Sequence, residues 1–349
     1  MKICINPAEK MTPVERKQAI EDGKAYDRIR CIPAMGELKS QVGGQTIWDM
    51  WHDPRKIAEI EVSAFNRFGH DQMMIGPNSY GIADALGADV IYAEDKLPYI
   101  GKNCLKDYQE LSGYEPLDAK KDDRIKTFLN AAEILADCAA PYVPITASVG
   151  GPMTIASYLR GVEYLLRDCK REPEQVHRLL RLVTDSEKSC MKAMGKYGFS
   201  IAMADPVANP ELIGPKYYKE FAYPYMKELT DYAYEVTGKK ANLHMCGRTY
   251  SIWKYFSQLN VQFLSLDNAI DLNRAKEELS PYLAVAGNVP PVEVVMNGTK
   301  EEIFQSVQEC ARIGKQMEQG YVLSTGCEIP YGTALSQIDW FMEAARQYG

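Results

Sequence analysis

Short apolar runs alternate with helical sequence along most of this chain, and this alternation constrains the fold more than any other feature. Each predicted strand is followed by sequence with helical periodicity, and the strands are predicted to start at Cys31, Gln72, Val143, Phe199, Ala241, Gln262, Leu283 and Tyr321. A doubly wound sheet would also alternate, but residues 31–36 lack the glycine-rich phosphate turn that usually follows its first strand. The sequence therefore predicts an α/β fold, a single (βα)8 TIM barrel.

Two segments are expected to lie outside the regular repeat. Thr12-Pro-Val-Glu15 is a capping box with Pro at the first helical position, so residues 1–30 are predicted to form an N-terminal helical arm. Residues 78–120 are less regular and are predicted to be an insertion after the second strand. No low-complexity linker divides the rest, so residues 31–349 are expected to form one barrel domain.

Composition excludes several classes of partner. The chain has 349 residues, 46% hydrophobic and 25% charged, which is typical of a globular protein. The formal net charge of -7, with Lys and Arg spread along the chain, argues against a nucleic-acid partner. No stretch approaches about 18 consecutive apolar residues, so no membrane span is expected. Nine cysteines and the lack of a signal-peptide pattern favour a reducing cytoplasm.

One histidine and two cysteines are candidate metal ligands. His244 and Cys246 are two positions apart on a predicted strand and therefore point to the same side. Cys327 follows the apolar run 321–325 and can bring a second thiolate to the same rim. Zinc prefers such an N/S/S set and can keep a fourth position for water, substrate or a weak carboxylate. The alternative is that all three residues simply pack, as buried free cysteines often do.

Acidic residues and methionines at strand ends are further candidates. Asp267 and Asp205 each end a strand, and either can supply a fourth ligand, although an acid at this place is often the N-cap of the next helix. Asp267 is the better candidate, because its strand lies next to the His-x-Cys strand. Four methionines also lie at strand ends and, with Asp205, are candidates to line a substrate pocket: Met35, Met73, Met74 and Met203.

Four motifs carry a resemblance that covers nearly the whole chain. They are Gly151-Pro-Met-Thr-Ile-Ala156, Gly287-Asn-Val289, His244-Met-Cys-Gly247 and Gly326-Cys-Glu-Ile-Pro330. With them the chain resembles the uroporphyrinogen decarboxylase superfamily, and within it the zinc-dependent corrinoid methyltransferases. The resemblance implies a zinc site formed by His244, Cys246 and Cys327, with Asp267 at the place of the fourth ligand that some relatives use.

The resemblance also implies an activity. It suggests an anaerobic O-demethylase methyltransferase that cleaves a phenyl methyl ether at zinc, a Lewis acid, and passes the methyl group to Co(I) of a corrinoid. The chain has no Asp-x-His-x-x-Gly cobalt-ligand loop, so a separate corrinoid protein is the expected partner. The alternative within this branch is a methylcobamide:thiol methyltransferase of the coenzyme M type.

A second alternative is a metal-free enzyme like uroporphyrinogen decarboxylase. That enzyme grips the tetrapyrrole carboxylates with an arginine-rich N-terminal segment, which residues 28–37 do not reproduce. Decarboxylation also needs no metal, which would leave the His-x-Cys pair unexplained. The sequence therefore favours the methyltransferases.

Overall fold

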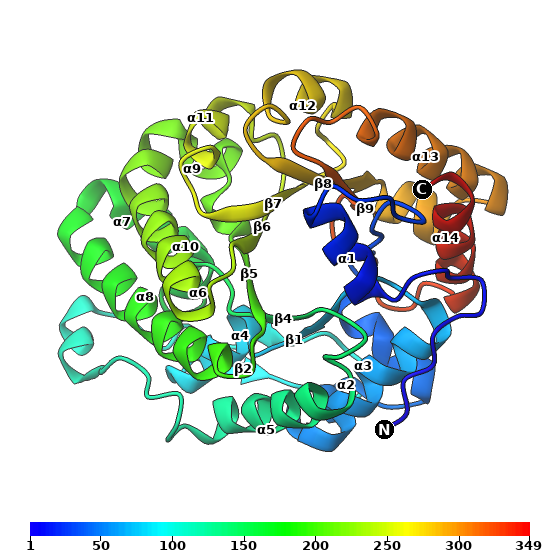
Figure 1. Ribbon diagram of the computed structural model, residues 1–349. Coiled ribbons are helices and arrows are strands. Elements are labelled where there is room, and N and C mark those ends of the chain that lie inside the picture. The colour runs from blue at the N-terminus through cyan, green and yellow to red at the C-terminus, as the bar shows by residue number, and fades with distance from the viewer. The chain divides into compact units, whose positions relative to one another are not determined.

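The computed structural model describes residues 1–349, and Figure 1 shows its helices and strands. The chain divides into two compact units. The first unit consists of Met1–Met74, Ala131–Thr146 and Phe263–Gly349, and the second of Ile75–Asn130 and Ala147–Gln262. Helices alternate with strands in both units, as the sequence predicts.

Seven strands pair in the order in which they occur in the chain, β1-β4-β5-β6-β7-β8-β9. Their bounds are β1 (Met73–Ile75), β4 (Ile145–Ser148), β5 (Ser200–Ala204), β6 (Ala241–Met245), β7 (Val261–Leu266), β8 (Ala284–Val289) and β9 (Tyr321–Thr325). Strand β5 is parallel to β6, and β8 is parallel to both β7 and β9. Sequential order with parallel pairing is what successive βα units produce. Seven of the eight predicted strands are thus present within about two residues of their expected starts.

The eighth predicted strand, at Cys31, is reduced to an isolated parallel bridge with Leu323. The Ile32 N–H donates to the Leu323 carbonyl at 2.9 Å, and the Leu323 N–H donates to the Arg30 carbonyl at 2.9 Å. On the other side, the Asp71 N–H donates to the Cys31 carbonyl at 2.9 Å. The segment therefore occupies the place of a strand beside β9. Pro33, two residues after Cys31, has no N–H to continue the ladder on the Asp71 side, and the Ala34 N–H donates to the Thr325 hydroxyl at 3.2 Å rather than to a carbonyl of β9.

The first unit contains the N-terminal arm. Helix α1 (Pro13–Glu21) has the predicted capping box, in which Thr12 and Glu15 each accept a backbone N–H of the other. Asp53 separates two further helices and caps the second. The helices of this unit are α1, α2 (Ile47–His52), α3 (Pro54–Phe68), α12 (Leu272–Glu278), α13 (Lys300–Gly314) and α14 (Leu335–Tyr348). A 3-10 helix, η1 (Gly36–Gly43), and a π-helix, η6 (Pro291–Met296), complete it.

The second unit contains the predicted insertion. After β1 the chain forms α4 (Asn78–Ala85), an antiparallel pair of β2 (Val90–Ile91) with β3 (Tyr99–Ile100), and η2 (Tyr108–Gly113). The remaining helices are α6 (Pro152–Arg160), α7 (Val162–Arg171), α8 (Pro173–Gly195), α9 (Pro210–Tyr217), η4 (Tyr218–Ala222), α10 (Tyr223–Thr237) and α11 (Trp253–Phe256), with short 3-10 turns η3 (Pro206–Ala208) and η5 (Tyr250–Ile252). Helix α5 (Asp123–Cys138) runs from the second unit into the first. No helix of the chain has the length and apolar content needed to cross a bilayer.

Side chains from three neighbouring strands of the first unit form a small apolar cluster. Phe263 of β7, Ala286 of β8 and Val322 of β9 are buried against one another, and Ile32 packs on them. Because side chains alternate along a strand, this packing fixes which residues of β8 and β9 point to the same side.

A buried ionic network in the first unit joins the arm to the segment before β1. The Arg16 guanidinium is fully buried and contacts Glu9 at 2.5 Å, Asp27 at 2.6 Å and Asp71. Arg28 also contacts Asp71, at 2.5 Å, and Glu9, at 3.0 Å. Charges held away from water are tolerated only when they are paired in this way, so loss of one member leaves the others uncompensated.

This network predicts that Arg16→Met destabilises the protein strongly. The free energy of unfolding should fall by about 3–5 kcal/mol, because Asp71 and Glu9 lose a buried partner. The matched control is Arg55→Met, whose side chain is 80% exposed and pairs with Glu59 on the surface of α3. It should cost less than about 1 kcal/mol. Denaturant unfolding of both variants tests this, and equal small losses would contradict a stabilising network.

Candidate metal centre

His244 and Cys246 lie together at the carboxyl end of β6 in the second unit. His244 Nε2 and Cys246 Sγ are 3.1 Å apart, and both side chains are partly buried. Parallel pairing of Ala204 with His244 fixes the strand end. Gly247 then turns the chain with φ +71°, and a Cβ there would lie 2.0 Å from Asn209 Nδ2, so the turn requires glycine. The predicted common orientation of His244 and Cys246 is confirmed.

Cys327 follows β9 in the first unit and is also partly buried. The Gly326 N–H donates to the Val289 carbonyl at 2.9 Å, and a Cβ on Gly326 would lie 2.3 Å from the Asn268 nitrogen. The turn before Cys327 therefore also requires glycine. Across this turn, the hydroxyl of Thr325 donates to the carbonyl of Cys327 at 2.7 Å.

The ligand atoms of His244, Cys246 and Cys327 all lie within 4.8 Å of one another. Zinc holds sulfur at about 2.3 Å and nitrogen at about 2.0–2.1 Å, so its tetrahedral ligands lie roughly 3.3–3.8 Å apart. The three residues thus fit zinc in both donor chemistry and spacing, and zinc binding itself stays a prediction.

Asp267, the preferred candidate for a fourth ligand, forms a tight turn after β7. Its Oδ1 accepts the Ala269 N–H at 2.8 Å, and its carbonyl accepts the Ile270 N–H at 3.1 Å. The Asn288 amide donates to the same carbonyl at 3.0 Å. The N-cap of the next helix is instead Asp271. The capping alternative therefore does not account for Asp267, and its role as a ligand stays a prediction.

Asp205 is fully buried and caps a helix that precedes it in the chain. Its Oδ1 accepts the Thr154 N–H at 2.8 Å and the Thr154 hydroxyl at 2.7 Å, and its Oδ2 accepts the Met153 N–H at 3.2 Å. These donors form the first turn of α6, whose own N-cap residue, Gly151, contributes no side chain. A Cβ on Gly151 would lie 2.4 Å from the Asp205 Cβ. The Gly151-Pro-Met-Thr154 motif therefore has a structural explanation. Its N–H groups and the Thr154 hydroxyl bind Asp205, and its glycine leaves room for the Asp205 side chain.

The four candidate pocket methionines differ in exposure. Met35, Met73 and Met203 are buried, whereas Met74 is partly exposed. The Met74 backbone is held by a buried ion pair, because its carbonyl accepts from Lys39 Nζ at 3.2 Å and its N–H donates to Glu61 at 3.3 Å. A substrate-pocket role for these residues stays a prediction.

Sequence reasoning missed two carboxyl groups beside Cys327. Glu328 is accessible to solvent, and its carboxyl occupies the space that a Cβ at Gly36 would fill. The surrounding protein and the hydrogen-bonded Glu37 carboxyl raise the pKa of Glu328 well above its usual range. The available signal was the position of Glu328 directly after the cysteine in Gly326-Cys-Glu.

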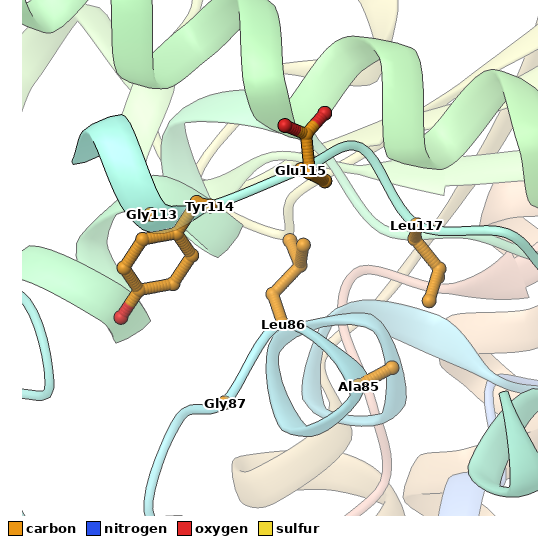
Figure 2. A pocket seen from close by; sticks show the side chains of 7 residues that line it. All are labelled: Ala85, Leu86, Gly87, Gly113, Tyr114, Glu115 and Leu117. Atoms are coloured by element: carbon orange, nitrogen blue, oxygen red, sulfur yellow. The ribbon is translucent and has the colours of Figure 1, made fainter.

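A surface hollow of about 400 Å³ lies elsewhere, at the carboxyl end of α4. Figure 2 shows its lining, which consists of Ala85, Leu86, Gly87, Gly113, Tyr114, Glu115 and Leu117. None of the candidate metal or pocket residues contributes to it, so we do not assign the hollow to the metal centre.

Comparison with known proteins supports the same branch. The chain is 25% identical over 349 residues to the methylcobamide:CoM methyltransferase MtbA of Methanosarcina acetivorans, covering 98% of each chain. It is 23% identical to the methylated-thiol--coenzyme M methyltransferase of Methanosarcina mazei, covering 97% of this chain and 90% of that one. It is also 24% identical to the uroporphyrinogen decarboxylase of Schizosaccharomyces pombe, covering 92% and 91%.

The fold is that of a solved methyltransferase from Methanosarcina mazei. That structure superposes with a TM-score of 0.86 and 22% identity, covering 97% of this chain and 99% of that chain. The predicted barrel class is thereby confirmed, and with the sequence matches it defines an α/β-barrel enzyme of the corrinoid-dependent methyltransferase class. The chain belongs to the uroporphyrinogen decarboxylase (URO-D) family, whose model matches residues 12–348.

Asp205 predicts a pH-dependent difference in stability. Burial raises its pKa to about 6, against the opposing effect of the hydrogen bonds from Thr154 and Met153. A group with a raised folded-state pKa contributes stability below its unfolded pKa and loses it as the pH rises through the folded value. The free energy of unfolding of the wild type relative to Asp205→Asn should therefore fall by up to about 3 kcal/mol between about pH 4 and about pH 7. Denaturant unfolding across this range measures it, and a constant difference would refute the raised pKa.

Proposed function

We propose that this protein is a zinc-dependent methyltransferase that takes the methyl group of an O-methyl substrate, such as a phenyl methyl ether, and passes it to Co(I) of a separate corrinoid protein. The observation that carries this proposal is the group formed by His244, Cys246 and Cys327, whose ligand atoms lie within 4.8 Å of one another. Zinc held there would supply a Lewis acid. The matches to methyltransferases over nearly the whole chain support the same class.

Each of the three residues has a defined task in this proposal. His244 binds through Nε2, the atom that faces Cys246 Sγ, and this nitrogen must be unprotonated to do so. Cys246 and Cys327 would hold the metal as thiolates, because a cysteine must lose its proton to bind zinc. Three protein ligands leave a fourth position, as in catalytic zinc sites. Asp267 would be the candidate protein group for that position.

A thiol methyltransferase is the second candidate. The specific observation that favours it is the nature of the relatives, which are named methylcobamide:CoM and methylated-thiol--coenzyme M methyltransferases. In that reaction a thiol would take the fourth position and accept the methyl group from the corrinoid. The same three protein ligands serve both candidates, so the zinc site alone does not separate them.

The corrinoid is proposed to arrive on a partner protein. This sequence contains no Asp-x-His-x-x-Gly loop to supply a cobalt ligand. Transfer requires the cobalt to come within bonding reach of the methyl carbon, so the partner must dock over the metal centre.

All nine cysteines are free, which supports a reducing cytoplasm as the location.

The zinc site predicts a metal content of about one ion per chain. Elemental analysis of protein purified under reducing conditions should show this zinc, and Cys327→Ala, Cys246→Ser and His244→Ala should each lose both the zinc and the transfer activity. Asp267→Ala is the matched comparison, because it leaves three ligands and should weaken zinc only in part. Zinc-free wild-type protein, or full turnover in a zinc-free variant, would favour the metal-free alternative.

The substrate class predicts the outcome of a direct assay. Holoprotein mixed with a Co(I) corrinoid should form methyl-Co(III), seen by visible absorbance, when given methoxylated aromatics. It should not demethylate a methylated thiol at a comparable rate. The control is Cys327→Ala with the same substrates. Rapid transfer to or from coenzyme M, with no reaction of any methoxylated aromatic, would instead establish the thiol candidate.

A further inference from the structure

We propose that Thr325 is a positioning residue that sets the Cys327 thiolate for metal binding through its side-chain hydroxyl. This inference rests on the proposed function, because it assumes that Cys327 is a zinc ligand. Thr325 does not itself offer a ligand atom to the site. It acts on the backbone of the turn that carries the cysteine.

The Thr325 hydroxyl joins two segments of the first unit. Thr325 is the last residue of β9 and is fully buried. Its Oγ1 accepts the Ala34 N–H at 3.2 Å and donates its own hydrogen to the Cys327 carbonyl at 2.7 Å. A hydroxyl can accept and donate at once, and both capacities are used here.

A second bond closes this link on the far side of the cysteine. The Ile329 N–H donates to the Ala34 carbonyl at 2.8 Å. Ala34 is therefore tied to the chain both before and after Cys327, by its N–H through Thr325 and by its carbonyl through Ile329. The turn itself belongs to no helix or strand. Its backbone depends on such bonds to hold one conformation.

Only a residue with a small hydroxyl fits this place. Valine has nearly the shape of threonine but can neither accept from Ala34 nor donate to Cys327, so two partly buried backbone groups would lose their partner. The turn would then shift to satisfy them, and the cysteine sulfur would move with it. Serine keeps the hydroxyl and should keep the geometry. The expected effect therefore follows the hydroxyl rather than the size of the side chain.

If replacing any buried threonine by valine weakened the protein in general, a threonine far from Cys327 in the sequence would show the same effect. Thr184 provides this control. Thr184 is also fully buried, on α8 in the second unit, and its hydroxyl has no hydrogen-bond partner. Thr184→Val makes the same chemical change at a site where no bond is lost. It controls for any general effect of replacing a buried threonine by valine.

The experiment measures the zinc dissociation constant by competition with a chromogenic chelator. Thr325→Val should bind zinc about 10- to 100-fold more weakly than the wild type, the usual effect of removing a group that orients a ligand. Thr325→Ser should stay within about threefold of the wild type, and Thr184→Val should be unchanged. Should the valine variant fail to fold, Thr325→Ala compared with Thr325→Ser tests the same hydroxyl. The thermal unfolding of the zinc-free variants is recorded beside each affinity.

Two results would overturn the inference. One is a valine variant that binds zinc as tightly as the wild type, and the other is a serine variant that is as weak as valine. Failure of the proposed function gives a different result, because then the wild type itself binds no zinc or Cys327→Ala retains it. The two failures are therefore distinguishable in the same set of titrations.

Discussion

Parallel pairing between successive strands is the constraint on which the site depends. Within the second unit, the pairing of Ala204 with His244 decides where β6 ends and therefore where Cys246 leaves the sheet. Within the first unit, Val289 pairs with Thr325, and the Gly326 N–H is bound one step later by the same Val289 carbonyl. A slip of one residue in either register would turn the ligand side chains to the opposite face. Backbone hydrogen bonds that involve none of the ligand atoms therefore determine where the candidate ligand side chains point.

The sequence predicts this part of the structure well because the signals are local. Seven strands, the arm and the insertion follow from apolar runs, caps and turn residues that act over a few positions. The common orientation of His244 and Cys246 follows from strand alternation alone. The weakened strand at Cys31 has a local cause as well, since the proline two residues later has no N–H. This proline is visible in the sequence, but the prediction of eight full strands did not take it into account.

Other features depend on contacts between distant segments, and the sequence does not reveal them. An acid at a strand end was expected to be either a ligand or the cap of the next helix, whereas Asp205 caps α6, which comes about 50 residues earlier. Glu37 and Glu328 are almost 300 positions apart, and only the fold brings their carboxyl groups together. Arg16 resembles an ordinary helix-surface residue in sequence but is fully buried among acids. In each case the group that the side chain contacts is distant in the sequence and is brought close only by the tertiary structure.

Percent identity alone does not separate the methyltransferases from the decarboxylase, and the candidate site residues add to the distinction. A decarboxylase matches it at 24% identity and a methyltransferase at 25%, each over more than nine-tenths of its length. The glycine motifs near α6 and β8 serve backbone packing, as the close approach of Gly151 to Asp205 shows, so a shared barrel is sufficient to explain them. The His-x-Cys pair and Cys327 have no such structural explanation. All three are partly exposed, Cys246 and Cys327 each adjoin a turn that requires glycine, and the ligand atoms of the three lie within 4.8 Å of one another. A packing role does not require ligand atoms of this kind to lie so close together, whereas a metal site does.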